Sequence, residues 1–95
     1  NGLNNIEKIN TKETVKLSKN KYYLYKVEFN KEYGNKLAKY LEIDDIYNNS
    51  SILTGEIYID KKGYVYKIIF RVEKIMIMTT YYDFNKVSEI KIPNN

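Results

Sequence analysis

The sequence predicts an α+β fold, in which an antiparallel sheet of about six strands carries one short amphipathic helix. The expected element order is β-β-α-β-β-β-β. Two observations lead to this prediction: apolar residues alternate with period two in residues 21–29 and 53–92, and they recur with a helical period in residues 30–41. The length of 95 residues and the hydrophobic content of 43% fit a single domain over residues 1–95, which we interpret as a fragment or module of a longer protein.

The first predicted element is a hairpin near the N-terminus. Residues 1–10 carry isolated apolar side chains three positions apart, which indicates either one or two helical turns or a frayed lead-in. Strands are expected at Thr11–Leu17 and Lys21–Phe29, with a turn at Ser18-Lys19-Asn20. Within that turn, Asn20 is the residue best suited to a positive φ.

The next segment changes to a helical period. Its apolar stripe holds four residues at i, i+4, i+7 and i+8: Tyr33, Leu37, Tyr40 and Leu41. Asn30 precedes the stripe and is a suitable N-cap. Gly34 lowers the helix propensity, so we expect a short helix that is held in place by packing.

Four further strands are expected after the helix. Their ranges are Leu53–Asp60, Tyr64–Glu73, Ile75–Phe84 and Val87–Ile92. Asp60-Lys61-Lys62-Gly63 has turn residues at its first and fourth positions. A turn is also required near Glu73-Lys74, because one strand over residues 64–84 would be about 70 Å long. Residues 83–86 form the last predicted turn.

The loop length at Glu73-Lys74 decides which side chains share a face. A two-residue loop places one apolar set together: Tyr64, Tyr66, Ile68, Phe70, Val72, Ile75, Ile77 and Tyr81. It leaves Met76, Met78, Tyr82 and Phe84 on the other face, whereas a three-residue loop reverses the assignment of the last of these strands. Either register gives the sheet more apolar surface than a one-sided sheet needs, so the N-terminal segment, a partner chain or a ligand is expected to cover part of it.

The residue inventory excludes several kinds of chemistry. The chain has no Cys and no His, which removes disulfides, thiolate and imidazole metal sites, a Cys nucleophile and a Ser-His-Asp triad. No pairing of the remaining acids proposes a general acid and base, since Asp44 and Asp45 are adjacent and point in different directions. We therefore expect no enzyme activity, no metal and no cofactor.

The net charge of +4 raises the question of an anionic partner. All of the 16 basic residues except Arg71 are Lys, and they are spread from Lys8 to Lys91. Because base-specific recognition relies on the Arg fork, this pattern argues against nucleic acid as the partner. The chain also lacks the run of about 18 apolar residues that a transmembrane helix requires.

The surplus apolar surface suggests where a ligand would bind. The candidate ligand-binding residues are Tyr23, Tyr25, Tyr66, Ile68, Phe70, Met76, Met78, Tyr82 and Phe84. Tyrosines on half-buried strands can stack on a ligand but more often serve packing, and Met side chains supply an adaptable apolar surface.

Two segments resemble a recurring pattern of bacterial cell-envelope lipoproteins. They are TGEIYIDKKGYVYKIIF and MTTYYDFNKVSEIKIP, at residues 54–70 and 78–93. Together with the preceding helix, they resemble the C-terminal half of the LolA/LppX-like superfamily over residues 21–93. The resemblance implies a half-barrel-like sheet with an apolar interior, a lipid-like ligand, and a secreted, extracellular or cell-envelope location. Lipid anchoring would require a lipidation Cys elsewhere in the full-length protein.

Three functional hypotheses follow. The leading one is a non-catalytic cell-envelope or extracellular module that binds an apolar, lipid-like molecule, a partner protein or a second copy of itself through the sheet face. The first alternative is a purely structural domain of a larger secreted protein, similar in build to cystatin-like or PepSY-like modules. The second alternative is weak electrostatic binding to nucleic acid or an anionic surface, which predicts that the lysines gather on one face.

Overall fold

The computed structural model describes residues 2–48 and 50–82. A 3-10 helix, Gly2–Asn5, is followed by strands β1 (Ile6–Leu17) and β2 (Asn20–Phe29), helix α1 (Lys31–Leu41), and strands β3 (Leu53–Ile59), β4 (Val65–Val72) and β5 (Ile75–Tyr81). All pairs of neighbouring strands are antiparallel. The predicted α+β class and antiparallel sheet are confirmed.

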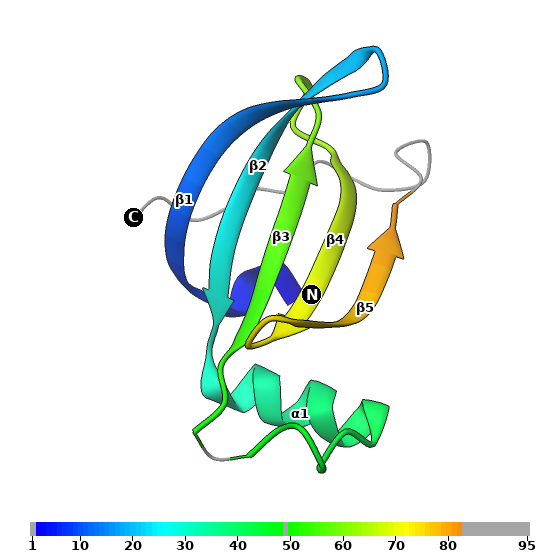
Figure 1. The fold of residues 1–95 in the computed structure, drawn as a ribbon. Coiled ribbons are helices and arrows are strands. Elements are labelled where there is room, and N and C mark those ends of the chain that lie inside the picture. Colours follow the sequence, from blue (N-terminus) through cyan, green and yellow to red (C-terminus); the bar gives the residue numbers. More distant parts are fainter. Residues whose placement is uncertain (1, 49, 83–95) are drawn as a thin grey trace.

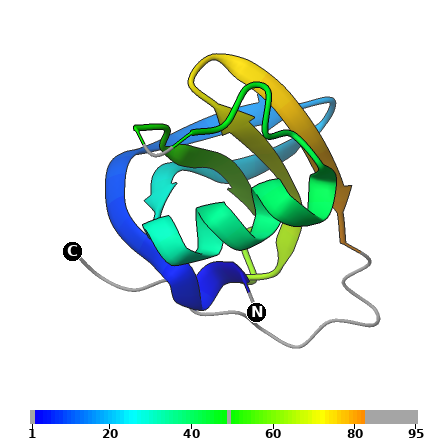
Figure 2. The same ribbon diagram turned by 90° about the horizontal axis from the view of Figure 1, so that it is seen from below.

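The five strands lie in one sheet in the order β1-β2-β3-β4-β5. Helix α1, which connects β2 to β3, lies at one end of the sheet (Figure 1). Seen from that end, the helix crosses the sheet and covers the end of its concave side (Figure 2). The β1–β2 and β3–β4 turns lie at the opposite end, which we call the tip (Figure 1).

The predicted sheet of about six strands in a half-barrel-like shape is wrong. The described residues form five strands, and the sheet does not make a clear half-barrel. The strand expected at residues 87–92 lies outside the described residues. The physical reason is that the concave side is closed locally, by α1 across its end and by the 3-10 helix, whose Leu3 is only 2% exposed.

Residues from the sheet and from the segments that cover it make up the core. Its buried members are Leu3, Val27, Phe29, Ala38, Tyr47, Leu53, Ile57, Ile59, Val65, Ile68, Phe70 and Val72. Near the helix end, the rings of Phe29 and Phe70 stack with their centroids 5.5 Å apart. Each buried side chain of this size contributes about 1.5–3 kcal/mol of transfer free energy, so this group provides most of the stabilisation of the sheet.

The helix begins where the sequence predicts. The Asn30 side chain accepts a hydrogen bond from the backbone N–H of Tyr33 at 2.8 Å, which makes it the N-cap. The buried positions of the helix are Gly34 and Ala38, whereas Tyr40, predicted to lie on the apolar stripe, is 81% exposed. Tyr33 and Leu37 of that stripe pack against the core. The small Gly34 lets the side chain of Tyr47 approach the helix backbone closely.

Each of the three hairpins turns where the sequence places it, with differences in detail. Ser18, rather than the expected Asn20, takes the positive φ of 55°, because Asn20 already belongs to β2. The Asp60 carboxylate accepts hydrogen bonds from the backbone N–H groups of Lys62 and Tyr64, at 2.9 and 3.0 Å. The Glu73-Lys74 loop has two residues, and Glu73 adopts a φ of 56°.

A β-bulge in the last hairpin separates the two methionines. Met76 lies opposite Arg71, but Phe70 pairs with Met78, so Ile77 is the extra residue. Neither predicted register is therefore right along the whole of β5. The register of a two-residue loop applies to Ile75 and Met76, and after the bulge the side chains of β5 lie on the faces opposite to those that this register predicts. As a result, Met78 packs against the core, whereas Met76 is 57% exposed.

Candidate functional site

The tip of the sheet contains an overhang. β2 pairs with β1 from Asn20 onward, but its pairing with β3 begins only at Tyr23, which lies opposite Ile59. Residues 20–22 therefore extend past the end of β3, and the β3–β4 turn lies beside them. This offset opens a pocket between the two turns.

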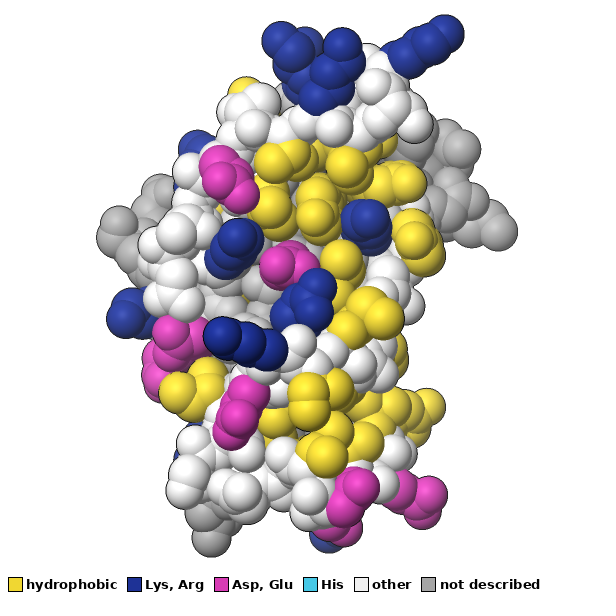
Figure 3. Space-filling model, in the orientation of Figure 1, with side chains coloured by type: hydrophobic (Ala, Val, Ile, Leu, Met, Phe, Trp, Pro, Cys, Tyr) yellow, Lys and Arg dark blue, Asp and Glu magenta, His cyan; other side chains and the backbone are white. Residues whose placement is uncertain are grey.

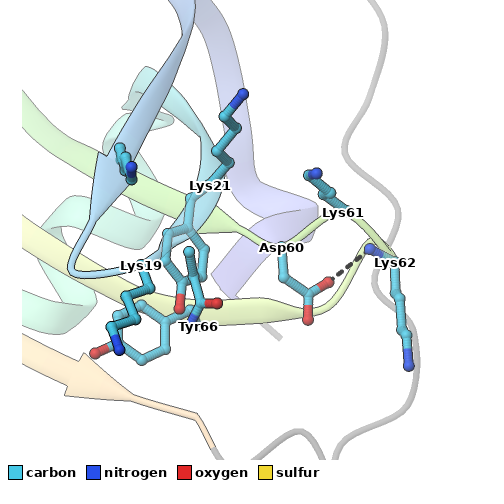
Figure 4. A pocket seen from close by; sticks show the side chains of 9 residues that line it. Lys19, Lys21, Asp60, Lys61, Lys62 and Tyr66 are labelled. Atoms are coloured by element: carbon cyan, nitrogen blue, oxygen red, sulfur yellow. Dashed lines mark hydrogen bonds between the residues drawn. The ribbon is translucent and has the colours of Figure 1, made fainter.

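The pocket has a volume of about 450 Å³. It is lined by Lys16, Lys19, Asn20, Lys21, Tyr22, Asp60, Lys61, Lys62 and Tyr66 (Figure 4). We call it the lysine pocket. A second pocket of about 190 Å³, lined by Thr14, Lys21, Tyr22, Tyr23 and Lys61, adjoins it. The first volume lies within the range of small-molecule sites in proteins.

The lysine pocket has a large excess of positive charge. Among the described residues its lining holds five lysines and one acidic residue, Asp60, whose Oδ1 accepts hydrogen bonds from two backbone N–H groups of its own turn. Within residues 2–48 and 50–82, the ion pairs involve other basic side chains: Lys26, Lys36 and Arg71. The five pocket lysines therefore have no acidic partner among the described residues.

Two of these lysines lie directly opposite each other. Lys16 pairs with Lys21 across the β1–β2 hairpin. Like charges at directly opposed positions destabilise a strand pair. A bound anion would remove that repulsion, so the arrangement favours the occupied state of the pocket over the empty one.

A stacked pair of tyrosines forms one wall of the pocket. The rings of Tyr22 and Tyr66 lie 4.8 Å apart with an interplanar angle of 23°, and Tyr81 meets Tyr66 edge-on at 5.9 Å. The neighbouring Lys67 places its ammonium group 4.7 Å from the centre of the Tyr58 ring. This face of the sheet shows lysines projecting from the tip and an apolar surface below them (Figure 3).

Burial also affects the tyrosine hydroxyl beneath that wall. It raises the pKa of Tyr58, and the nearby Glu56 carboxylate raises it further, against a smaller opposing effect of Arg71. Tyr58 is therefore a neutral hydrogen-bonding group near pH 7. Tyr58 therefore adds no negative charge beside the lysine ammonium groups of this surface.

The nine residues predicted to bind a ligand are not brought together. Ile68 and Phe70 lie in the core, and Tyr25, Met78 and Tyr82 pack against it. Tyr23 and Met76 are 40% and 57% exposed, and Phe84 lies outside the described residues. Two of the nine line the pockets at the tip: Tyr66 the larger one and Tyr23 the smaller one.

The five pocket lysines were not among the predicted site residues. They are distant in sequence, at positions 16–21 and 61–62, and the turns that carry them look ordinary. A usable signal was nevertheless present. In an antiparallel meander the first and third turns lie at the same end of the sheet, and here both turns carry lysines.

No family model, curated protein or solved structure matches this chain. The resemblance to LolA/LppX-like lipoproteins therefore stays a prediction, as do the envelope location and the lipid ligand that it implies. In the part of the chain that the structure describes, no helix is both long and apolar enough to cross a membrane.

Proposed function

We propose that this protein is a non-catalytic binding module that takes an anionic ligand in the lysine pocket at the tip of the sheet. One observation carries the proposal: two hairpins distant in sequence bring five lysines to the lining of a single pocket, in which Asp60 is the one acidic residue among those described. This corresponds to the electrostatic alternative among the hypotheses drawn from the sequence, with a defined pocket in place of a diffuse surface.

Lysines suit this role because an ammonium group is a compact charge that binds phosphate or carboxylate without a fixed geometry. A charge pair at 4 Å is worth about 1 kcal/mol in water and more in a partly enclosed site. Several such contacts made at once give micromolar to millimolar affinity, and salt should weaken it strongly because the pocket is open to solvent.

The apolar-ligand hypothesis has less support from the geometry. Two of its central residues, Ile68 and Phe70, are 2% and 4% exposed. Other side chains of the core already fill the space around them. A lipid-like molecule could contact them only if the core opened. The lysine pocket requires no such rearrangement.

Calorimetric titration with inorganic tripolyphosphate tests the proposal. We expect binding at low salt that weakens at least tenfold when the NaCl concentration is raised from 50 to 300 mM. The double variant K19Q/K61Q should bind at least tenfold more weakly than the wild type. K36Q/K39Q is the matched control, since it removes the same charge from α1 at the opposite end of the sheet.

The two double variants separate a site from a general charge effect. If both lose affinity equally, the binding reflects net charge and the pocket has no specific role. If the wild type does not bind tripolyphosphate at low salt, the proposed function is wrong.

A second candidate function is association with a partner protein, or with a second copy of the chain, through β5. Three large apolar residues of that strand are exposed: Ile75 by 54%, Met76 by 57% and Tyr81 by 64%. Sedimentation velocity over a hundredfold range of concentration would detect self-association, and Met76→Glu should abolish it. A monomer at every concentration would rule out the homodimer.

A further inference from the structure

The two pockets at the tip are parts of one site. They share three residues, Lys21, Tyr22 and Lys61, which come from the overhanging end of β2 and from the β3–β4 turn. A ligand can therefore extend from one pocket into the other without leaving the surface. The two parts differ in chemistry, and this difference indicates what kind of ligand fits both.

The larger part is the more cationic. In addition to the shared lysines, it holds Lys16, Lys19 and Lys62. The smaller part adds Tyr23 and Thr14, so two tyrosines and a threonine line it together with the two shared lysines. Its volume of about 190 Å³ is large enough for a single ring.

Tyr22 is held ready for stacking. Its ring packs on Tyr66 at 4.8 Å, and Tyr66 is in turn fixed by the edge of Tyr81. An aromatic side chain that is already immobilised loses little conformational entropy when a ligand ring stacks on it. Tyr23, which is 40% exposed, borders the same small pocket.

Resting on the proposed function, we infer that the ligand is a phosphorylated compound with an aromatic heterocycle, of the class of nucleoside di- and triphosphates. Its phosphates lie among the lysines of the larger pocket, and its ring lies in the smaller pocket against Tyr22 or Tyr23. Lys21 and Lys61, which belong to both pockets, contact the phosphate nearest the ring. The step is reversible binding and breaks no bond.

The other tyrosines of this face argue against a long single-stranded nucleic acid. Single-strand binding needs a row of open ring faces along the path of the strand. Here the ammonium group of Lys67 lies 4.7 Å from the ring centre of Tyr58 and 5.9 Å from those of Tyr66 and Tyr81. The ammonium group of Lys12 likewise lies 5.4 Å from the ring centre of Tyr23. The surface left for stacking is therefore small, which fits a single ring better than a row of bases.

Titration calorimetry with three compounds tests the inference: ATP, inorganic tripolyphosphate and adenosine, in magnesium-free buffer. ATP and tripolyphosphate carry the same three phosphates, and tripolyphosphate has one more ionisable oxygen. Tighter binding of ATP must therefore come from the nucleoside. We expect ATP to bind about tenfold more tightly than tripolyphosphate, from stacking on one ring. Adenosine alone should bind at least tenfold more weakly than ATP.

Two tyrosine variants locate the ring. Tyr22→Leu and Tyr23→Leu should each be compared with Tyr40→Leu, a control on the helix at the opposite end, where Tyr40 is 81% exposed. We expect at least one of the first two to lose fivefold or more in ATP affinity, and to lose clearly less in tripolyphosphate affinity. The urea denaturation midpoint of each variant shows that it is folded.

The outcomes distinguish this inference from the proposed function. If ATP and tripolyphosphate bind equally well, the ring makes no contact and the inference is wrong, although the anion site stands. If neither binds, both are wrong. If adenosine binds as tightly as ATP, or if both tyrosine variants behave like the control, the assignment of the two pockets is overturned.

Discussion

The two ends of the sheet are built from the same strands but differ in almost every physical respect. At the helix end, Phe29 of β2 and Phe70 of β4 stack with their centres 5.5 Å apart, and a Cβ added at Gly55 would lie 2.7 Å from the Phe29 ring. At the tip, Tyr22 and Tyr66 of the same two strands form the wall of a pocket of about 450 Å³. One end is closed by packing, and the other is open and charged.

Because of this difference, one end of a strand contributes to the stability of the fold and the other end contributes to binding. Burial of large apolar groups stabilises a fold, and unpaired like charges oppose it. β2 carries both, with Phe29 in the core and Lys21 opposite Lys16 at the tip. Substitutions at the helix end should therefore change the free energy of unfolding without changing anion affinity. Substitutions of the lysines at the tip should weaken anion binding without loss of stability.

The largest expected effect is that of Phe70→Ala. Phe70 is 4% exposed, and its removal leaves a cavity beneath Phe29. We expect a loss of about 3–5 kcal/mol in the free energy of unfolding, measured by urea denaturation. Tripolyphosphate affinity, measured at a temperature where the variant is folded, should change less than twofold.

Phe70→Leu provides a milder version in case the alanine variant does not fold. It should lose less stability and retain the same affinity. If tripolyphosphate affinity falls in both variants in proportion to their loss of stability, the two ends are not independent and the comparison is wrong.

Sequence reasoning succeeded for elements whose signals are local. Asn30 and the helical period after it located α1 correctly, and the Asp60–Gly63 turn followed from its own residues. The bulge at Ile77 has no such signal, because it depends on how β5 fits against β4 and the core. The half-barrel-like shape was wrong because closure of the concave side depends on packing between distant segments.

The site was harder to predict than the fold. The lysine pocket exists because β2 overhangs the end of β3 by residues 20–22, and that offset is a property of pairing between separate hairpins. Residue types alone pointed to the apolar side chains of β4 and β5, most of which are in the core or pack against it. The even distribution of the lysines along the sequence did not indicate that some of them lie close together in space, as Lys19 and Lys61 do in the lining of one pocket.

An intermediate effect is expected where the helix meets the loop before β3. The Tyr47 hydroxyl is buried with no hydrogen-bond partner among the described residues, and a Cβ at Gly34 would collide with it. Gly34→Ala should therefore cost about 1–3 kcal/mol, despite the better helix propensity of Ala. Tyr47→Phe alone should be neutral or stabilising, since it removes an unpaired polar group.

The double variant Gly34→Ala/Tyr47→Phe tests the collision directly. It should recover most of the stability lost by Gly34→Ala, measured by urea denaturation, whereas additive losses would show that the hydroxyl is not the cause.

A series of denaturation curves at increasing pH adds a second measurement. Burial raises the pKa of Tyr47, so the folded state favours the neutral hydroxyl; this contribution is complete below pH ~10 and is lost as the pH rises through the folded-state pKa. Tyr47→Phe should reduce that alkaline loss.

The smallest effect, and the most informative about the tip, is expected for Asp60→Asn. Asn offers the same carbonyl oxygen to the backbone N–H groups of Lys62 and Tyr64, so the turn and the free energy of unfolding should be retained. Among the described residues, Asp60 supplies the one negative charge that lines the lysine pocket. Its removal should strengthen tripolyphosphate binding by about 1 kcal/mol or less, roughly two- to fivefold. The gain should shrink in 300 mM NaCl, because salt screens the interaction between the Asp60 carboxylate and the anion.

Asp60→Ala is the contrasting variant: it removes the same charge and also the two hydrogen bonds of the turn, so it should lose about 1 kcal/mol of stability. If Asp60→Asn weakens binding, the carboxylate must contact the ligand or hold a lysine in place, and the pocket would not act as a simple cationic site.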